Sequence, residues 1–564
     1  MNNIIKHNDI VILDIIFFIL FLSISNIFFT NLPPGVGLSL FVNNIVWLAG
    51  VTFVFVAIIL AVNRGYWTKP EEFIIHLSLI LALVIPFLWS DDNTGRGFYR
   101  MLGAVFGIVY FLCLITSFPK KNIWFLILTI SLSGLIQAIW GIVQIWIIPE
   151  SVVPNGIPMG VFQQPNVMAS YIATTFTVSL LLISTYPVPF EKMDKWVSHS
   201  INLFAFIAGM IIISINPATV YVALAISLPF MLLAHRESPY GILKAIIFLL
   251  LGGLFIGLIN SGIFLNNDFM SFSMDETFNS GGRKIIWLIS WELFKENWLT
   301  GVGYGNFEHA YLEYQAGYYQ QHGLYGFARV NHPHNELILW SVEGGVLPGL
   351  AFVSYTLYTI WRMFKMGAPA LPYAAILIPL VAHALLEFPF YHSAIHWILF
   401  VTLLYLFETH AAKTKDVSFE YKILIITTTT FSSLLAVLFF ITNMHGIYIL
   451  NKFNESGFNQ RNIKVFSSIK NNFTVRPHLD YFTLESLFRK GLLENDESLI
   501  KKSILLSEKL NADHPRPEYY KSMLTGYKAI GDKAGFKLKL DEARHYYPLD
   551  KYFLEVEEQL GLML

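Results

Sequence analysis

Residues 39–62 read SLFVNNIVWLAGVTFVFVAIILAV and contain no charged side chain. A helix needs roughly 20 apolar residues to cross the ~30 Å hydrocarbon core of a bilayer, so this stretch predicts a membrane-spanning helix. The pattern recurs along most of the chain and predicts an all-α, polytopic helical membrane protein with about 13 spans, with 12 to 14 also compatible. The predicted spans are residues 10–29, 39–62, 72–89, 99–118, 123–148, 166–186, 201–215, 217–234, 243–262, 336–361, 371–390, 394–409 and 423–443.

The composition also indicates a membrane protein, because 55% of the 564 residues are hydrophobic and 14% are charged. Soluble domains usually carry about 25% charged residues, which excludes an ordinary soluble enzyme and a disordered chain. The formal net charge of −1 provides no field that would attract nucleic acid. Cys113 is the one cysteine, so disulfides and cysteine metal clusters within one chain are excluded.

Lysine and arginine in the short loops predict the orientation, because cytoplasmic loops of membrane proteins are enriched in both. With Lys6 in the cytoplasm, every inside loop holds Lys or Arg, whereas the short outside loops hold only Arg96. The N-terminus is therefore predicted to be cytoplasmic, and the long 263–335 loop and the C-terminus lie outside. In a Gram-negative bacterium this describes an inner-membrane protein with a periplasmic C-terminus.

The charged residues are concentrated near the C-terminal end, where residues 444–564 hold 34 of the 77. Apolar positions there form helices of about 15 residues between short loops, which is typical of tetratricopeptide-like helix pairs; a plain capping domain is the alternative. Four regions follow from this organisation. They are an N-terminal transmembrane bundle (1–262), a large periplasmic loop (263–335), C-terminal transmembrane helices (336–443) and a periplasmic helical domain (444–564).

Four polar clusters fall on the predicted outer side. In the first, Gln163, Gln164 and Asn166 offer amide donors and acceptors that suit sugar hydroxyls and phosphate oxygens, although capping of a helix that starts at Pro165 would explain them too. In the second, Arg283 provides a planar fork for phosphate and Lys284 a point charge. An interfacial helix with snorkelling cations is the alternative there.

The other two clusters contain histidines. His332 and His334 precede an apolar run, where an imidazole can act as a base near neutral pH. A zinc pair would need a third ligand, which His383 or His392 could supply. Glu387 and Tyr391 stand at the end of another span. An ionisable group at that depth must be paired or neutral, and Arg283 or a histidine is the expected partner of Glu387. Tyr391 could donate to a phosphate or a sugar, and an aromatic belt with a structural ion pair is the alternative.

The sequence around these clusters resembles the O-antigen ligase superfamily and, within it, the bacterial protein O-oligosaccharyltransferases. Residues 298–307 (WLTGVGYGNF) are similar to the family's outer-loop turn, and His334-Asn335 followed by nine residues and Gly345 matches its His-Asn signature. Residues 162–166 (FQQPN) resemble the segment typical of protein-glycosylating members, and residues 386–391 (LEFPFY) resemble their C-terminal region. Pro348 departs from the motif, which usually has Gly, Thr or Tyr there.

The resemblance implies that a preassembled oligosaccharide on undecaprenyl diphosphate is transferred en bloc to a Ser or Thr hydroxyl of a pilin-like or other exported protein. No metal or other cofactor is expected. Arg283, with Lys284 behind it, would stabilise the leaving diphosphate. His334 or His332 would orient or deprotonate the acceptor hydroxyl, and attack from the back would invert the anomeric carbon. Substrate contacts are expected from Gln163, Gln164, Asn166, Asn335, Glu387 and Tyr391.

Four other functions are alternatives, and one of them is a membrane assembly scaffold that uses the helical C-terminal region. An O-antigen ligase would transfer the glycan to lipid A core, and an O-antigen polymerase would extend a lipid-linked chain. A transporter of lipid-linked sugars would need ionisable residues on both faces and midway through its spans, whereas the polar clusters here share one face.

Overall fold

The computed structural model is predominantly helical, which confirms the all-α polytopic class. It describes every residue except 1–6, 30–36, 91–95, 119–121, 149–155, 262–279, 412, 419, 457–462, 514 and 562–564. The first part of the predicted outer loop, 263–279, therefore lies outside the described residues. By its internal contacts the chain divides into two compact units. Unit 1 comprises Met1–Ile80, Val105–Phe278 and Val353–Ile441, and unit 2 comprises Leu81–Ala104, Asn279–Phe352 and Thr442–Leu564.

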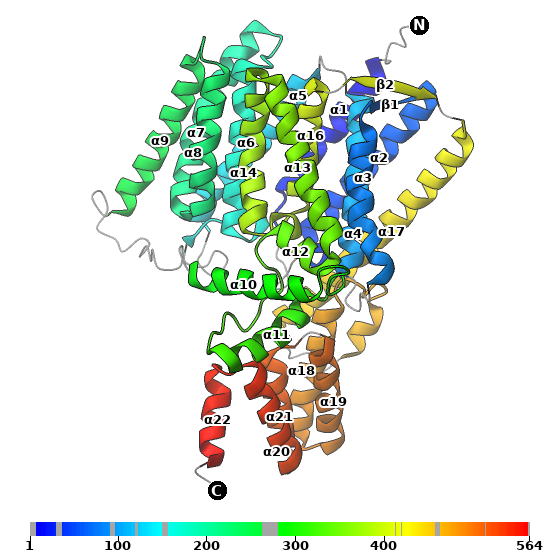
Figure 1. The fold of residues 1–564 in the computed structure, drawn as a ribbon, viewed down its shortest axis with the longest axis vertical. Coiled ribbons are helices and arrows are strands. Elements are labelled where there is room, and N and C mark those ends of the chain that lie inside the picture. The colour runs from blue at the N-terminus through cyan, green and yellow to red at the C-terminus, as the bar shows by residue number, and fades with distance from the viewer. Residues whose placement is uncertain are drawn as a thin grey trace. The chain divides into compact units, whose positions relative to one another are not determined.

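Unit 1 is a bundle of apolar helices (Figure 1). Its elements are α1 (His7–Phe18), α2 (Phe41–Arg64), β1 (Tyr66–Pro70), α5 (Ile123–Trp146), α6 (Pro165–Ser184), α7 (Glu191–Ile215), α8 (Ala218–Ala234), α9 (Tyr240–Asn260), α14 (Leu371–Leu386), α15 (Pro389–His392), α16 (Ala394–Ala411) and β2 (Thr414–Ser418). Four further helices are divided between the two units: α3 (Phe73–Val84), α4 (Arg96–Ser117), α13 (Val346–Met366) and α17 (Lys422–Glu455).

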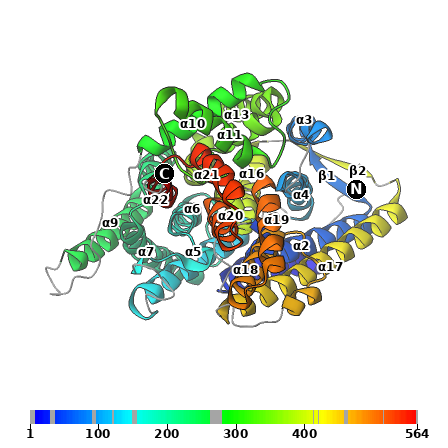
Figure 2. The same cartoon turned by 90° about the horizontal axis from the view of Figure 1, so that it is seen from below.

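Helix α6 lies at the centre of unit 1, where it packs against α5, α7 and α14. Figure 2 shows α5, α6 and α7 end-on beside one another. Helices α7 and α9 approach closely because Gly209 and Gly252 face the partner backbone: a Cβ on either would lie 1.9 or 1.8 Å from a carbonyl oxygen of the other helix. Small residues allow this close packing between membrane helices.

The candidate spans agree with the predicted ones except around residue 345. Among the described residues, nine helices are long and apolar enough to cross a membrane, and Val11–Asn26, Phe73–Trp89 and Ala218–Ala234 are shorter apolar helices. The predicted span 336–361 is wrong as a single helix. It breaks at Gly345, whose φ of +78° ends α12 (Glu336–Gly344) before α13 begins. The total of 13 spans stays a prediction.

A small antiparallel sheet was not predicted. β1 pairs with β2 over five residues, from Tyr66 opposite Ser418 to Pro70 opposite Thr414. The Thr68 hydroxyl donates to Asp416 at 2.7 Å across the pair. The sheet joins two loops of unit 1 that are far apart in the sequence, so alternation within either loop alone was too short a signal to reveal it.

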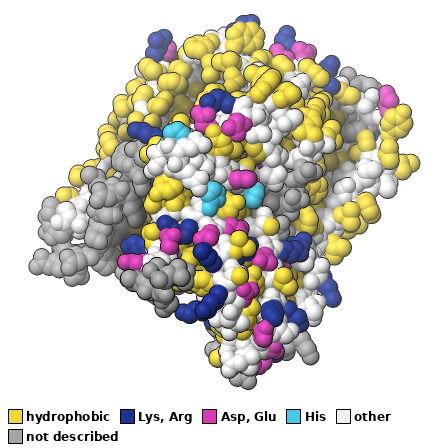
Figure 3. Space-filling model, turned by 60° about the horizontal axis from the view of Figure 1, so that its bottom comes forward, with side chains coloured by type: hydrophobic (Ala, Val, Ile, Leu, Met, Phe, Trp, Pro, Cys, Tyr) yellow, Lys and Arg dark blue, Asp and Glu magenta, His cyan; other side chains and the backbone are white. Residues whose placement is uncertain are grey.

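Unit 2 contains α10 (Ser280–Glu296), α11 (Phe307–His322) and α12, followed by five C-terminal helices. These are α18 (Arg476–Glu494), α19 (Glu497–Asp513), α20 (Pro517–Ala529), α21 (Lys533–Tyr546) and α22 (Lys551–Gly561). From α18 to α21 each helix packs on the next, and charged side chains gather on the surface of these C-terminal helices (Figure 3). Leu312 of α11 joins their core, which includes Tyr520 and Met523. A tetratricopeptide-like arrangement stays a prediction.

Candidate active site

Two glycines fasten the 298–306 loop of unit 2 to the end of α12. Gly301 has a φ of +75°, and a Cβ there would lie 2.2 Å from the Glu343 carbonyl oxygen. Gly345 has a φ of +78°, and its Cβ would lie 2.3 Å from the Leu299 carbonyl oxygen. Backbone N–H groups of Val302 and Val346 complete the junction, donating at 2.9 and 2.7 Å to Val342 and Trp298. This interlock explains physically why glycine stands ten residues after Asn335.

A buried ion pair sits at this junction. Arg100 donates to the Glu343 carboxylate, and the other Glu343 oxygen accepts the Phe307 backbone N–H at 3.1 Å. The Arg100 guanidinium also lies 4.9 Å from the ring centroid of Tyr304 and 4.5 Å from that of Trp340. Arginine commonly pairs with carboxylates and aromatic faces in this way when buried. This role of Arg100 was not predicted from the sequence, where the one signal is an arginine at the start of an apolar run.

The His332–Glu336 segment forms a strained turn that presents His334. His334 has a φ of +56°, an uncommon conformation for a residue with a side chain. Its backbone N–H donates to His332 Nδ1 at 2.8 Å. The Asn335 side chain caps α12 by accepting the Ile338 N–H at 3.0 Å. His332 is buried and His334 is partly exposed, so the two imidazoles have different surroundings.

Helix α10 is packed against the same segment of unit 2. Trp287 Nε1 donates to the Pro333 carbonyl at 2.9 Å. Arg283 lies one turn earlier on α10 and therefore on the same side of the helix as Trp287. A Cβ on Gly282 would meet the Phe327 ring at 2.3 Å, so the start of α10 also rests on the loop before His332. Lys284 is exposed, while Arg283 is partly buried.

Glu336 completes the polar cluster. One of its carboxylate oxygens lies 3.9 Å from His332 Nε2. Burial raises the pKa of the Glu336 carboxyl to about 8, although the nearby Arg100 charge lowers it. Because His332 Nδ1 accepts a backbone hydrogen bond, the proton of a neutral His332 ring is on Nε2, facing Glu336. Helix α12, which carries Glu336, is not among the candidate spans.

We expect Glu336→Gln to flatten the pH dependence of stability. The folded pKa of about 8 lies above the ordinary value of 4.5, so the folded state keeps a proton that the unfolded state loses. Its stabilising contribution is complete below pH 4.5 and is lost as the pH rises towards 8, a change of several kcal/mol. Thermal midpoints of purified wild type and variant at pH 5 and pH 8 measure this. Equal pH slopes for the two proteins would contradict it.

The predicted glutamine cluster lies in unit 1. Gln163 has a φ of +55°, and its side chain donates to the Phe29 carbonyl at 2.7 Å, which is a structural contact. Gln164 occupies the N-cap position of α6, and the side chains of Gln164 and Asn166 are partly exposed. Gln144 supports the preceding turn, accepting from the Gly160 N–H at 2.7 Å and donating to its carbonyl at 3.1 Å.

A buried network of serines and histidines lies beneath this turn. The Ser170 hydroxyl is 2.5 Å from His383 Nδ1 and 3.2 Å from His396 Nε2. His396 Nδ1 is 2.7 Å from the Ser393 hydroxyl. The sequence predicted His383 as a member of the polar cluster with Glu387 and as a possible zinc ligand, but this network could not be predicted because its members are far apart in the chain. Within the described residues no group of three or more His, Cys, Asp or Glu could hold a metal ion.

Glu387 and Tyr391 are also in unit 1. Glu387 is buried at the end of α14, where its N–H donates to the His383 carbonyl at 2.8 Å. Tyr391 is partly buried in the short α15. The predicted residues therefore fall into two groups: Gln163, Gln164, Asn166, Glu387 and Tyr391 in unit 1, and Arg283, Lys284, His332, His334 and Asn335 in unit 2.

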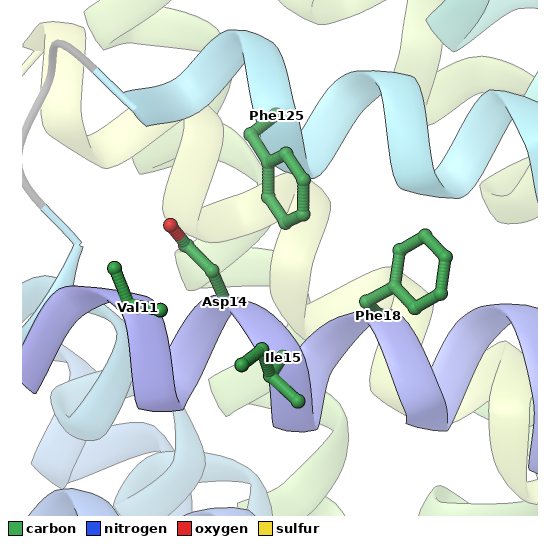
Figure 4. A pocket seen from close by; sticks show the side chains of 5 residues that line it. All are labelled: Val11, Asp14, Ile15, Phe18 and Phe125. Carbon is green, nitrogen blue, oxygen red and sulfur yellow. The ribbon is translucent and has the colours of Figure 1, made fainter. Parts of the chain in front are cut away.

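A pocket of about 380 Å³ lies between α1 and α5 of unit 1. Its lining is apolar except for Asp14, whose carboxylate points towards the space beside Phe125 (Figure 4). Asn122 donates to this carboxylate at 3.3 Å. The pocket contains no predicted site residue, so it is not the candidate active site.

Three family models match parts of the chain. The model described as O-Antigen ligase matches residues 203–354, and the model described as Protein glycosylation ligase matches residues 158–182. These matches support an O-antigen ligase superfamily protein. A third model, Virulence factor membrane-bound polymerase, C-terminal, matches residues 373–560. No curated protein and no solved structure matches the chain.

The matched segments cover the two groups of site residues. The O-antigen ligase match includes Arg283 and His334, and the protein glycosylation ligase match includes Gln164 and Asn166. The matches and the apolar helices together support a multi-pass membrane enzyme that transfers glycosyl groups.

Proposed function

We propose that this enzyme transfers a preassembled oligosaccharide en bloc from undecaprenyl diphosphate to Ser or Thr hydroxyls of pilin-like or other periplasmic proteins. The observation that carries the proposal is the geometry of unit 2. His334 is held in a left-handed turn by His332, and α10 is fastened to that turn through Trp287 and carries Arg283 on the same side. The protein glycosylation ligase match at residues 158–182 supports a protein acceptor.

The proposed reaction is an inverting displacement. The acceptor oxygen attacks the anomeric carbon from the side opposite the diphosphate, a carbon–oxygen bond forms, and the bond to the diphosphate oxygen breaks. His334 takes the hydroxyl proton, and Arg283 stabilises the negative charge of the departing undecaprenyl diphosphate. His332 acts through the turn rather than on the substrate, because its Nδ1 is occupied by the His334 N–H.

The remaining predicted residues keep proposed binding roles. In unit 2, Lys284 adds positive charge near the diphosphate and Asn335 caps the helix that follows the turn. In unit 1, the proposed contacts of the glycan or diphosphate are Gln164, Asn166 and Tyr391. Gln163 and Glu387 support the segments that carry these residues. The proposed setting is the bacterial inner membrane, with a cytoplasmic N-terminus and a periplasmic C-terminus, and the four sequence-based regions remain the proposed domains.

Polymerisation of a lipid-linked glycan is the second candidate. The membrane-bound polymerase match over residues 373–560 favours it, since that segment includes Glu387, Tyr391 and the C-terminal helices. Both reactions use the same donor and leaving group, so they differ in the acceptor. Ligation of the glycan to lipid A core would also use this donor and would differ from both reactions in its acceptor.

We expect wild-type enzyme, co-expressed with a lipid-linked glycan pathway and a pilin-like acceptor, to add one glycan mass to the acceptor. Arg283→Ala should lower this transfer about 10²-fold or more, because the positive charge that stabilises the leaving diphosphate is lost. Arg283→Lys is the matched control and should retain part of the activity, since the charge remains without the fork. Intact mass spectrometry of the acceptor measures the yield at matched membrane levels.

Other outcomes of this experiment identify the competing functions. Glycan on lipid A core with an unmodified acceptor would indicate a ligase, and longer lipid-linked chains would indicate a polymerase. Equal transfer by all three proteins would remove Arg283 from the mechanism. Movement of lipid-linked sugar across the membrane without transfer would indicate a transporter.

A further inference from the structure

One face of α11 in unit 2 carries a row of aromatic rings that the proposed mechanism does not use. Tyr314, Tyr318 and His322 follow one another at intervals of four residues, so they lie on one side of the helix. The Tyr314 and Tyr318 rings stack with centroids 6.5 Å apart and planes inclined by 25°. Tyr318 and His322 stack at 4.1 Å and 19°. We call these three residues the aromatic row.

The aromatic row is partly exposed, whereas the adjoining face of α11 is fixed in the fold. Leu312 and Gln315 on that adjoining face are buried, and the Gln315 side chain accepts the Gly326 N–H at 3.0 Å and donates to the Phe327 carbonyl at 3.1 Å. Beside the row, a Cβ on Gly317 would meet open space. The rings are therefore held in place by a packed helix but face outwards.

Contact with lipid does not account for these rings. Helix α11 is polar, is not among the candidate spans and carries Glu308, Glu313 and Gln320, so its rings do not form part of a lipid-facing apolar surface. The His322 Nδ1 lies 3.2 Å from the Tyr318 carbonyl, which helps keep that imidazole parallel to the tyrosine ring. Rings arranged in advance of binding reduce the entropy lost when a ligand settles on them.

Carboxylates of α10 stand beside one end of the aromatic row. Burial raises the pKa of the Tyr314 hydroxyl, and the charges of Glu296 and Glu292 and a hydrogen bond to Glu296 raise it further, so both carboxylates are close to that ring. Glu292 also pairs with Lys295 at 2.6 Å. Flat rings next to hydrogen-bond acceptors suit a sugar, whose polarised C–H faces lie on aromatic rings while its hydroxyls donate to carboxylates.

The distance along α10 between Arg283 and Glu296 indicates which sugars of the glycan would reach the aromatic row. Arg283, the proposed contact of the diphosphate, and Glu296 are 13 residues apart on this helix, or ~20 Å along its axis. The sugar bonded to the diphosphate would therefore remain near Arg283, and sugars farther along the glycan would reach Tyr314 and Tyr318. The row itself extends ~12 Å along α11, so it offers room for more than one sugar ring.

We propose that the aromatic row is a binding subsite for the distal sugars of the donor's oligosaccharide. The proposal rests on the proposed function for the identity of the donor. It assigns the row a specificity role: favouring long glycans over short ones without touching the reacting atoms.

The test compares two donors with the same first sugar. One is undecaprenyl diphosphate carrying a single N-acetylhexosamine, and the other carries a longer oligosaccharide that begins with that sugar. In the full-length enzyme, Tyr314→Ala/Tyr318→Ala should lower transfer from the longer donor about ten-fold and leave transfer from the short donor within about two-fold. The control, Tyr314→Phe/Tyr318→Phe, keeps both rings and should keep both activities, with thermal midpoints checked for all variants.

A second measurement separates the subsite from the reaction. Saturation-transfer NMR should detect the same oligosaccharide, released from its lipid, on detergent-solubilised wild type and on the phenylalanine variant but not on the alanine variant. Equal losses with both donors, no loss with either, or unchanged NMR contacts in the alanine variant would overturn the subsite. If wild type transfers neither donor, the proposed function fails, and the NMR comparison still decides whether the row binds glycan.

Discussion

His334→Asn should abolish glycan transfer, whereas His332→Asn should leave most of it intact. Asparagine tolerates the left-handed conformation that His334 adopts, so the turn is kept while the imidazole is lost. Loss of a general base lowers the rate by about 10²- to 10⁴-fold. At His332, the asparagine Oδ1 is as many bonds from the backbone as Nδ1 and can accept the His334 N–H in its place.

Two further substitutions at His332 test this hydrogen bond. His332→Ala leaves the His334 N–H without its acceptor, which costs about 1–3 kcal/mol and lowers the occupancy of the active turn roughly 5- to 150-fold. His332→Gln places its oxygen one bond too far and should resemble alanine. Acceptor mass measured at equal membrane levels gives all four activities.

The pattern across the series distinguishes the two histidines. Neither asparagine nor glutamine can take a proton, so equal inactivation by His332→Asn and His332→Gln would make His332 the chemical group. An active His334→Asn enzyme would remove His334 from the proton transfer. If, among the three His332 variants, only His332→Asn retained transfer activity, His332 would be identified as a positioning residue.

Gly301→Ala should destabilise the enzyme by about 3 kcal/mol or more and abolish transfer. The added Cβ would lie 2.2 Å from the backbone oxygen of Glu343, and this contact cannot be relieved by moving a side chain. The φ of +75° adds strain for any residue with a Cβ. Thermal midpoints of the detergent-purified proteins and acceptor mass in cells measure the two effects.

Gly531→Ala is the matched control for Gly301→Ala. Gly531 also belongs to unit 2 and has a φ of +73°, but a Cβ there would meet nothing within 4 Å. Only backbone strain remains, so we expect a loss of about 1–2 kcal/mol and normal transfer. Equal shifts in the two variants would show that strain, rather than the interlock of the loop with α12, makes Gly301 necessary.

The class of protein could be predicted from local sequence. A run of about 20 apolar residues spans a bilayer wherever it stands, so most candidate spans needed no knowledge of their neighbours. The error at 336–361 has the same origin: mean hydropathy continues through Gly345, whereas the backbone turns there because Gly301 and Leu299 approach it. Local composition could not reveal a break that depends on a loop more than 40 residues earlier.

For the candidate site, the sequence alone supplied the residue types and the resemblance, including Arg283, His332 and His334. Which imidazole supports the turn and which is presented was decided by tertiary structure, through the hydrogen bond from His334 N–H to His332 Nδ1. The pairing of Arg100 with Glu343 likewise joins residues 243 positions apart. Spacing along a chain predicts contacts only within a helix turn or a strand pair, so partners that meet by packing become visible only in the folded protein.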